Sequence, residues 1–84
     1  MKDRVKLFKA LSDESRLNII EFLLAGEKCV CEIVSHVKRT QSTVSIQLAK
    51  LDALGIVSSR RDGKRIFYRI TNEIVKEILE IVRE

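Results

Sequence analysis

Proline and tryptophan are absent from this chain of 84 residues, and glycine occurs only three times. There is no proline-rich, glycine-rich or repetitive stretch, so nothing in the sequence marks an inter-domain linker. No apolar run is long enough to cross a bilayer, and Met1-Lys2-Asp3-Arg4 does not begin a signal peptide. We therefore expect residues 1–84 to form a single globular, cytoplasmic domain that does not associate with membranes.

Cysteine and histidine are also scarce. The cysteines are Cys29 and Cys31, and the single histidine is His36, which we expect at the surface or partly packed. Two thiols one residue apart are no disulfide framework for a small secreted domain, so we expect them to be reduced. The sequence contains no Ser-His-Asp set, phosphate loop or metal-ligand cluster. A thiol oxidoreductase would use C-x-x-C spacing rather than C-x-C, so we expect that the protein is not an enzyme.

The excess positive charge of the chain is concentrated in one segment. The net charge is +4, and residues 58–70, with five Lys or Arg and one Asp, also carry a net charge of +4. The rest of the chain contains equal numbers of cationic and anionic side chains. A surface without a target usually intersperses its charges, so this asymmetry favours a polyanionic partner over a merely soluble turn.

Apolar side chains recur every three or four residues in five segments, which predicts five helices. Their apolar residues are, in chain order, Val5, Phe8 and Leu11; Leu17, Ile20, Leu23 and Leu24; Val30, Ile33, Val34 and Val37; Val44, Leu48 and Leu51; and Ile74, Val75, Ile78, Leu79, Ile81 and Val82. The second helix is predicted to have a cap at Ser12 or Asp13 and to end at Gly26. The fourth is predicted to span Gln41–Leu54 after a cap at Thr40. The last is predicted to have a cap at Thr71 or Asn72 and to reach Arg83.

Two strands joined by a tight turn follow the fourth helix. Residues 56–61 and 64–70 form the strands, and Asp62-Gly63 between them favours a type I′ turn. Ile66, Tyr68 and Ile70 alternate onto one face, which we expect to be the core side. This order of elements predicts an α+β fold that is mostly α with a β-hairpin wing, a winged helix-turn-helix.

The fourth helix and the hairpin carry groups suited to DNA. Val44, Leu48 and Leu51 share one face, which leaves an outward face that is small and mostly uncharged and suits a major groove. We expect base contacts from Gln41, Ser42, Thr43 and Ser45. We expect phosphate contacts from Lys38, Arg39, Arg60, Arg61, Lys64 and Arg65. The alternatives are that Gln41 and Ser42 only satisfy the helix end, or that the module binds protein, which the outward Ile46 favours.

These motifs resemble the ArsR/SmtB family of dimeric winged-helix repressors along nearly the whole chain. Residues 11–17, LSDESRL, are similar to the family segment L-x-D-x-x-R-L, and residues 41–48, QSTVSIQL, to its recognition helix Q-x-x-V-S-x-H-L. Residues 54–57, the R-D-G-K-R wing and the following Phe67-Tyr68 also match. Glu14 replaces a frequent Pro. Gln47, which we include among the DNA contacts, stands where the family commonly has His, and this leaves its role open. The resemblance implies a repressor that leaves its operator when an inducer binds.

The resemblance also implies a role for the two thiols. Residues 27–33, EKCVCEI, resemble the family metal box E-L-C-V-C-D-L, whose soft thiolates suit As(III), Sb(III), Cd(II) or Pb(II) as inducer. On a regular helix Cys29 and Cys31 would lie about 200° apart and could share one ion only if the helix start were unwound. Val34 stands where As(III)-responsive members often carry a third cysteine, and the terminal helix lacks the histidine of the other family site. Reversible thiol oxidation and a structural relic remain alternatives.

The apolar residues of the last helix cover more than one stripe, too wide for burial against one thin domain. The first helix offers a second apolar surface at the other end of the chain. Because unmet apolar faces on a small domain usually mark subunit interfaces, we expect a homodimer built from the first and last helices. The alternative is that the tail wraps its own core.

Overall fold

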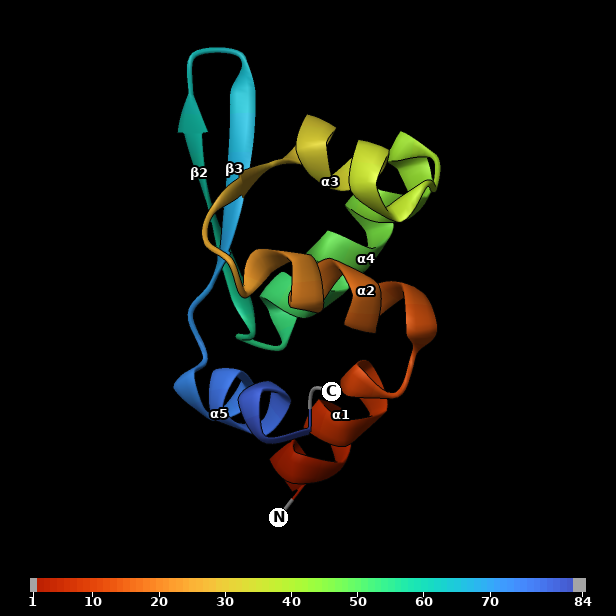
Figure 1. Ribbon diagram of the computed structural model, residues 1–84, viewed down its shortest axis with the longest axis vertical. Coiled ribbons are helices and arrows are strands. Elements are labelled where there is room, and N and C mark those ends of the chain that lie inside the picture. The colour runs from red at the N-terminus through yellow and green to blue at the C-terminus, as the bar shows by residue number, and fades with distance from the viewer. Residues whose placement is uncertain (1, 83–84) are drawn as a thin grey trace.

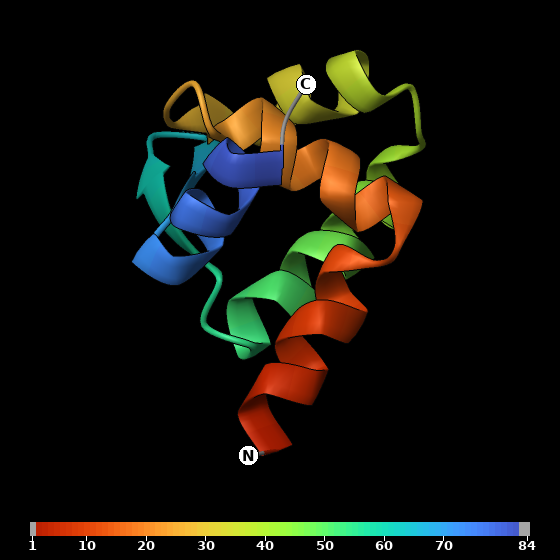
Figure 2. The same cartoon turned by 60° about the horizontal axis from the view of Figure 1, so that its bottom comes forward.

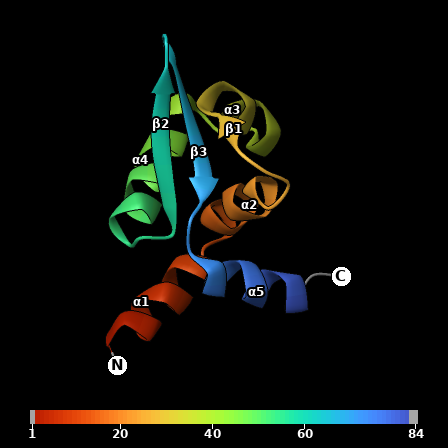
Figure 3. The same cartoon turned by 90° about the vertical axis from the view of Figure 1, so that its left-hand side faces the viewer.

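The computed structural model describes residues 2–82 and contains the five predicted helices in the predicted order (Figure 1). The elements are α1 (Lys2–Leu11), α2 (Glu14–Leu23), β1 (Lys28–Cys29), α3 (Val30–Val37), α4 (Gln41–Ala53), β2 (Val57–Asp62), β3 (Arg65–Ile70) and α5 (Glu73–Val82). The predicted end of the last helix at Arg83 lies outside the described residues. The hairpin projects from one end of the molecule, and α1 and α5 lie at the opposite end (Figures 1 and 3).

A third strand, β1, extends the predicted hairpin into an antiparallel sheet with the order β1-β3-β2. Lys28 is paired with Tyr68, and Cys29 is paired with Phe67. The sequence did not predict β1, because two residues are too few to show an alternating pattern. The consequence for the thiols is direct, since Cys29 belongs to a strand rather than to a helix.

The turn of the wing lies one residue later than predicted. Asp62 is paired with Arg65, so the two turn residues are Gly63 and Lys64 rather than Asp62 and Gly63. Gly63 has a φ of +63°, whereas Lys64 is not among the residues with positive φ. Positive φ at the first turn position alone fits a type II′ turn with glycine first, and it excludes the predicted type I′ turn.

The core lies where α2, α3, α4 and α5 meet the base of the hairpin. Val44, Leu48 and Leu51 of α4 are fully buried, as their spacing predicts. The predicted core face of β3 is only partly correct: Ile70 is buried and Tyr68 half-buried, whereas Ile66 is 38% exposed. Ile66 lies toward the tip of the hairpin, which extends beyond the helices (Figure 1). No helix within residues 2–82 is long and apolar enough to cross a membrane.

Both ends of α4 are closed by local hydrogen bonds. At its start the backbone N–H of Thr43 donates to Oγ1 of Thr40 at 3.1 Å, which confirms the predicted cap. At its end Gly55 has a φ of +73°, and the N–H groups of Gly55 and Ile56 donate to the carbonyls of Asp52 and Leu51. This pair of bonds is a Schellman motif, which needs a left-handed residue at the position of Gly55.

The outer helices leave apolar side chains uncovered. On α5 the side chain of Asn72 accepts hydrogen bonds from the N–H groups of Ile74 and Val75, so Asn72 is the cap. Val75 and Leu79 of α5 are buried, but the helix also presents apolar groups to solvent, as does α1. The exposed apolar residues of these two helices are Val5, Phe8, Ile74, Ile81 and Val82. α1 lies beside the C-terminal half of α4 (Figure 2).

Candidate nucleic-acid interface and thiol site

A short turn joins α3 to α4 and sets their relative orientation. Lys38 ends α3 in the left-handed conformation, with φ 56° and ψ 43°, and its N–H donates to the carbonyl of Val34 at 3.1 Å. It is the one non-glycine residue with positive φ between residues 2 and 82. A side chain in this conformation costs about 1–2 kcal/mol. Lys38 and Arg39 are both exposed just before the start of α4, where they were predicted to contact phosphates.

The first turn of α4 presents polar side chains to solvent. Thr40 supplies the cap, and its hydroxyl also donates to Oγ1 of Thr43 at 3.0 Å, so Thr43 is half-buried within the cap. Gln41, Ser42 and Ser45 are exposed. Thr40, rather than Gln41 or Ser42, accepts the capping hydrogen bond from Thr43.

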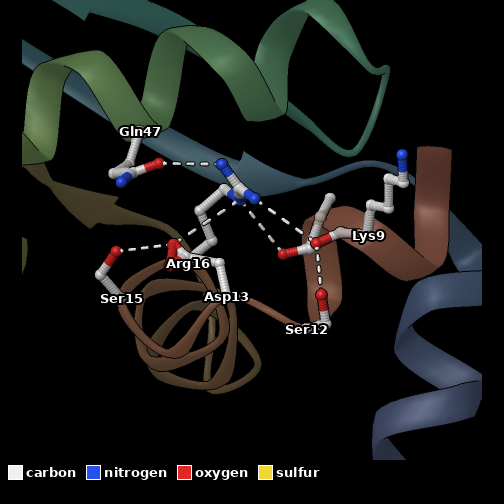
Figure 4. A network of polar contacts seen from close by, with 7 residues as sticks. Lys9, Ser12, Asp13, Ser15, Arg16 and Gln47 are labelled. Carbon is white, nitrogen blue, oxygen red and sulfur yellow. Dashed lines mark hydrogen bonds and ion pairs between the residues drawn. The ribbon is translucent and has the colours of Figure 1, made fainter.

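Gln47 instead faces Arg16, a residue that was not predicted to belong to the site. Nη1 of Arg16 donates to Oε1 of Gln47 at 3.3 Å (Figure 4). The same guanidinium donates to the carbonyls of Ala10 and Lys9 at 3.2 and 3.4 Å and lies 3.8 Å from the carboxylate of Asp13. Arg16 therefore ties the end of α1 and the start of α2 to the middle of α4. Arg16 is the Arg of the L-x-D-x-x-R-L segment, and this match is the sequence signal that could have identified its structural role.

The cations of the wing are not equivalent. The guanidinium of Arg60 binds the carboxylate of Glu27, with Nη2–Oε1 and Nε–Oε2 distances of 2.6 and 2.9 Å. It also lies over the ring of Phe67, 4.7 Å from the centroid. The hydrogen bond from Arg60 lowers the pKa of Glu27 below its ordinary value. To bind a phosphate, Arg60 would have to leave this ion pair.

The other three wing cations, Arg61, Lys64 and Arg65, are exposed. Together with Lys38 and Arg39, they supply positive charge on both sides of the first turn of α4. Cations and polar side chains are the two kinds of group that DNA-binding proteins use, the first for phosphates and the second for base edges.

The thiol pair is closer than the sequence predicted. Because α3 begins at Val30, Cys29 is the extended N-cap residue, with φ −68° and ψ 147°. Its Sγ lies 2.7 Å from Sγ of Cys31. The expectation that the two thiols point to opposite sides of one helix is therefore wrong, because the helix does not include Cys29. Cys29 is buried, whereas Cys31 is exposed.

Hydrogen bonds at the start of α3 distinguish the two thiols. The backbone N–H of Glu32 donates to Sγ of Cys29, while the N–H of Cys29 donates to Oε1 of Glu32 at 3.0 Å, which completes a capping box. The hydrogen bond with Cys31, followed by those from the backbone N–H groups of Cys31 and Glu32, lowers the pKa of Cys29. The same hydrogen bond raises the pKa of Cys31. The two thiols are therefore not equivalent, because their contact favours the thiolate form of Cys29 over that of Cys31.

A cavity of about 500 Å³ connects the thiols to the predicted DNA-binding face. The polar residues that line it are Cys29 and Cys31 at the start of α3, Gln41 and Ser45 of α4, Lys64 and Arg65 of the wing, and Tyr68 of β3. Nothing in the sequence pattern predicts this convergence, which depends on the pairing of β1 with β3. His36 is elsewhere, with its ring stacked on Phe22 at a centroid distance of 3.9 Å.

The donor set of the site is two sulfurs. Within residues 2–82 no group of three or more His, Cys, Asp or Glu side chains could hold a metal ion. Thiolates are the ligands that soft, thiophilic ions prefer. The sulfurs of Cys29 and Cys31, which lie 2.7 Å apart, would have to separate to bind one such ion together.

Comparison with known sequences places the chain among transcriptional regulators. The profile of the family described as "Bacterial regulatory protein, arsR family" matches residues 13–59. The arsenical resistance operon repressor of Staphylococcus aureus is 33% identical over 79 residues, which cover 94% of this chain and 76% of the repressor. A cadmium resistance transcriptional regulatory protein CadC homolog of the same species is 40% identical over 79 residues, 93% of this chain. The chain spans only 65% of the length of that homolog.

Solved structures share the fold along almost the whole chain. HlyU from Vibrio cholerae N16961 has a TM-score of 0.92 and 34% identity, with 96% of this chain and 88% of that chain covered. The homodimeric winged helix-turn-helix DNA-binding domain of Mb0332 from Mycobacterium bovis, a possible ArsR-family regulator, has a TM-score of 0.88 and 33% identity and covers 98% and 76% of the two chains. These matches confirm the predicted fold and the expectation that the protein is not an enzyme. The chain belongs to the arsR family of bacterial regulatory proteins, which are winged helix-turn-helix regulators of transcription.

Proposed function

We propose that this regulator is a sequence-specific, cytoplasmic repressor that a thiophilic metal or metalloid ion releases from operator DNA by binding Cys29 and Cys31. The observation that carries the proposal is the shared cavity, which has the two thiols and the first turn of α4 in its walls. Relatives named for resistance to cadmium, mercury and arsenicals support an ion as inducer, with As(III), Sb(III), Cd(II) and Pb(II) as candidates.

The proposed DNA contacts use two kinds of side chain. The outward face of α4 enters the major groove, and its base contacts come from Gln41, Ser42, Thr43 and Ser45. Gln47 joins them only by giving up its hydrogen bond from Arg16. The main phosphate contacts come from Lys38, Arg39, Arg61, Lys64 and Arg65, and Arg60 contributes less because it is paired with Glu27. The exposure of all but Thr43 and Gln47 supports these assignments, and the buried stripe of α4 orients its polar face outward.

The Glu27 ion pair predicts that two wing cations respond differently to mutation. Lys64→Ala should weaken binding to all duplexes alike and reduce the slope of log K against log salt by about 1 for each bound subunit. Arg60→Ala should change the slope less, because Glu27 already neutralises Arg60. Fluorescence anisotropy with one duplex over a salt series measures both slopes. Equal reductions would show that Arg60 leaves Glu27 for a phosphate, contrary to this prediction.

We also propose a homodimer through α1 and α5, with DNA binding and dimerisation in the single domain 1–84. Its support is the uncovered apolar surface of both helices, together with the homodimeric state of the similar Mycobacterium bovis domain. The α4 helices of the two subunits would then enter successive major grooves of a pseudo-palindromic operator.

Ile81 provides a test of this interface, since its side chain is 80% exposed on α5. Ile81→Glu should raise the dimer dissociation constant at least about 100-fold, because an unpaired carboxylate would be buried in an apolar interface. Ile46→Glu is the matched control, because Ile46 is an exposed isoleucine of α4. Sedimentation equilibrium gives the mass of each variant in solution and hence its oligomeric state. A two-chain mass for Ile81→Glu at low concentration would place the interface elsewhere.

The residues around the thiols suggest how ion binding reaches the DNA-binding face. A bound soft ion supplies a Lewis acid that prefers thiolate ligands. To provide them, the thiols of Cys29 and Cys31 give up their protons and the hydrogen bond between them, and the two sulfurs separate. This movement disturbs the capping box at the start of α3, which packs against α4. The ion therefore favours a conformation with a differently placed α4, and its differential affinity sets the size of the effect.

The decisive experiment is fluorescence anisotropy on operator DNA selected from random duplexes, with reduced protein. Arsenite, antimonite, cadmium, lead and peroxide are added in turn. We expect at least one ion to release the DNA, and the Cys29→Ser/Cys31→Ser variant to bind DNA normally but to ignore the ion. Tight binding indifferent to every addition would reject the ion-release proposal and leave only a DNA-binding regulator.

Thiol oxidation is a second candidate signal, and a specific observation favours it. The lowered pKa of Cys29 and the adjacent thiol of Cys31 are the features of an oxidisable pair. Release by peroxide but by none of the ions, reversed by a reductant, would establish a redox-controlled regulator instead.

A further inference from the structure

The cavity beside the thiols has the properties of a ligand site in its own right. We propose that it binds an anionic low-molecular-weight thiol, which supplies a third sulfur to an ion held by Cys29 and Cys31 and places its carboxylates against Lys64 and Arg65. This inference rests on the proposed function, because it specifies how the same site reaches full coordination. It assigns the cavity a ligand class that neither the fold nor the thiol pair alone implies.

The chain itself is short of one sulfur donor. Trivalent arsenic and antimony form three bonds to sulfur, and the sequence has only two cysteines. Within residues 2–82 no third His, Cys, Asp or Glu side chain forms a ligand cluster with the two thiols. The thiols of a partner subunit would be remote in the proposed dimer. The start of α3 lies toward the hairpin, while α1 and α5 form the opposite end of the molecule (Figure 1).

The size and lining of the cavity favour a small anion. Its volume of about 500 Å³ lies within the range of ordinary ligand pockets, about 300–1,000 Å³. Lys64 and Arg65 contribute two positive charges, and the described residues that line the cavity include no Asp or Glu. Val34 and Leu48 provide apolar wall, which can contact the carbon skeleton of a ligand.

The thiols and the cations are near enough to act on one ligand. Lys64 and Arg65 line the same cavity as Cys29 and Cys31. Cys31 is exposed and can meet a ligand from solution, whereas Cys29 is buried behind it. A molecule with one thiol and one or two carboxylates could therefore reach the ion and the wing together.

The assembly reaction balances without an oxidant or a reductant. Arsenite at neutral pH is As(OH)₃, and three thiols react with it. Each As–O bond is replaced by an As–S bond, and each thiol proton leaves with a hydroxide as water, which gives three water molecules. Two of the thiols are those of Cys29 and Cys31, and the third belongs to the external molecule. Arsenic remains trivalent throughout.

Occupation of the cavity would also affect DNA binding directly. Gln41 and Ser45 line the same cavity, so a ligand there stands beside the first turn of α4. Carboxylates paired with Lys64 and Arg65 would compete with DNA phosphates for these cations. The anionic thiol would thus increase the effect of the ion, and the ion with a neutral thiol should release DNA less completely.

The test uses reduced protein freed of small thiols, arsenite, and three thiols of different charge. These are mercaptosuccinate, mercaptoethanol and cysteamine, which are anionic, neutral and cationic. X-ray absorption gives the number of sulfurs around arsenic, and equilibrium dialysis gives the bound thiol and the apparent affinity. We expect three sulfurs, one mercaptosuccinate per chain, and a preference of about tenfold for mercaptosuccinate over cysteamine from two partly solvated charge contacts.

Variants separate this electrostatic effect from the intrinsic reactivity of each thiol. Lys64→Gln/Arg65→Gln should abolish the preference for mercaptosuccinate, while Arg61→Gln, which removes a wing cation that does not line the cavity, should keep it. The substituted side chains are exposed, and circular dichroism checks that each variant is folded.

Two outcomes would overturn the inference in different ways. Equal arsenite binding with all three thiols, unaffected by the double variant, would reject the anionic thiol but leave ion sensing intact. No arsenite binding with any thiol would reject both the thiol site and the ion-release part of the proposed function. DNA binding by the same sample would still be measurable, so the regulator itself would stand.

Discussion

The variant Ser42→Asp is expected to lose operator binding while its fold becomes slightly more stable. Ser42 is the second residue of α4 and is exposed, and the first turn of that helix has no acidic residue. A carboxylate there interacts favourably with the helix dipole and should add about 0.3–1 kcal/mol to the free energy of unfolding. Against DNA the same carboxylate faces phosphates, and the repulsion is about 1–4 kcal/mol per half-site.

This variant is informative because its stability should rise while its affinity for the operator falls. Urea unfolding measures the free energy of unfolding, and fluorescence anisotropy measures the affinity for the selected operator. Ser42→Asn is the control, because it has the shape of Asp without its charge and should retain most of the binding. Operator affinity unchanged in Ser42→Asp would show that the start of α4 does not enter the groove.

The variant Leu48→Ala should have the largest effect on stability. Leu48 has no exposed surface and lies at the centre of the buried stripe of α4. Truncation to Ala should lower the free energy of unfolding by about 2–5 kcal/mol through lost burial and a residual cavity. A domain of this size has a total of about 4–13 kcal/mol, so much of the stability would be lost.

Ile46→Ala is the matched control, since the same helix exposes 57% of that side chain on its opposite face. We expect a change within about 0.5 kcal/mol. Urea unfolding of both variants is compared at one protein concentration, because dimerisation makes apparent stability depend on concentration. Similar losses in the two variants would mean that α4 is rotated relative to the structure described above.

Helix α4 shows which features local sequence can predict. The spacing of Val44, Leu48 and Leu51 predicted its buried face, and Thr40 predicted its start. Both signals act over less than two helical turns, so they can be read without knowledge of the rest of the fold. The end at Gly55 follows the same logic, because the left-handed position of a Schellman motif favours glycine.

The wing shows the limit of this approach. The strands and the short turn were predicted from β-branched residues and glycine, but the turn was placed one residue too early. Pairing of Asp62 with Arg65 decides the register, and Asp-Gly and Gly-Lys are both acceptable turn sequences. The contacts between Arg60 and Glu27 and between Arg16 and Gln47 were likewise missed. Each joins residues more than thirty positions apart, which no periodic pattern reports.

The fold, the buried face of α4 and the cationic wing could be predicted before the structure was known, because they depend on local periodicity, caps and charge. The family was indicated by the resemblance of short motifs. The geometry of the thiol site, in contrast, depends on contacts between distant parts of the chain. Pairing of Cys29 with Phe67 takes that residue out of the helix, brings its sulfur to 2.7 Å from Cys31, and directs the pair into a cavity shared with α4 and the wing. That pairing is between distant strands, and the two-residue strand that makes it is too short to leave a pattern in the sequence.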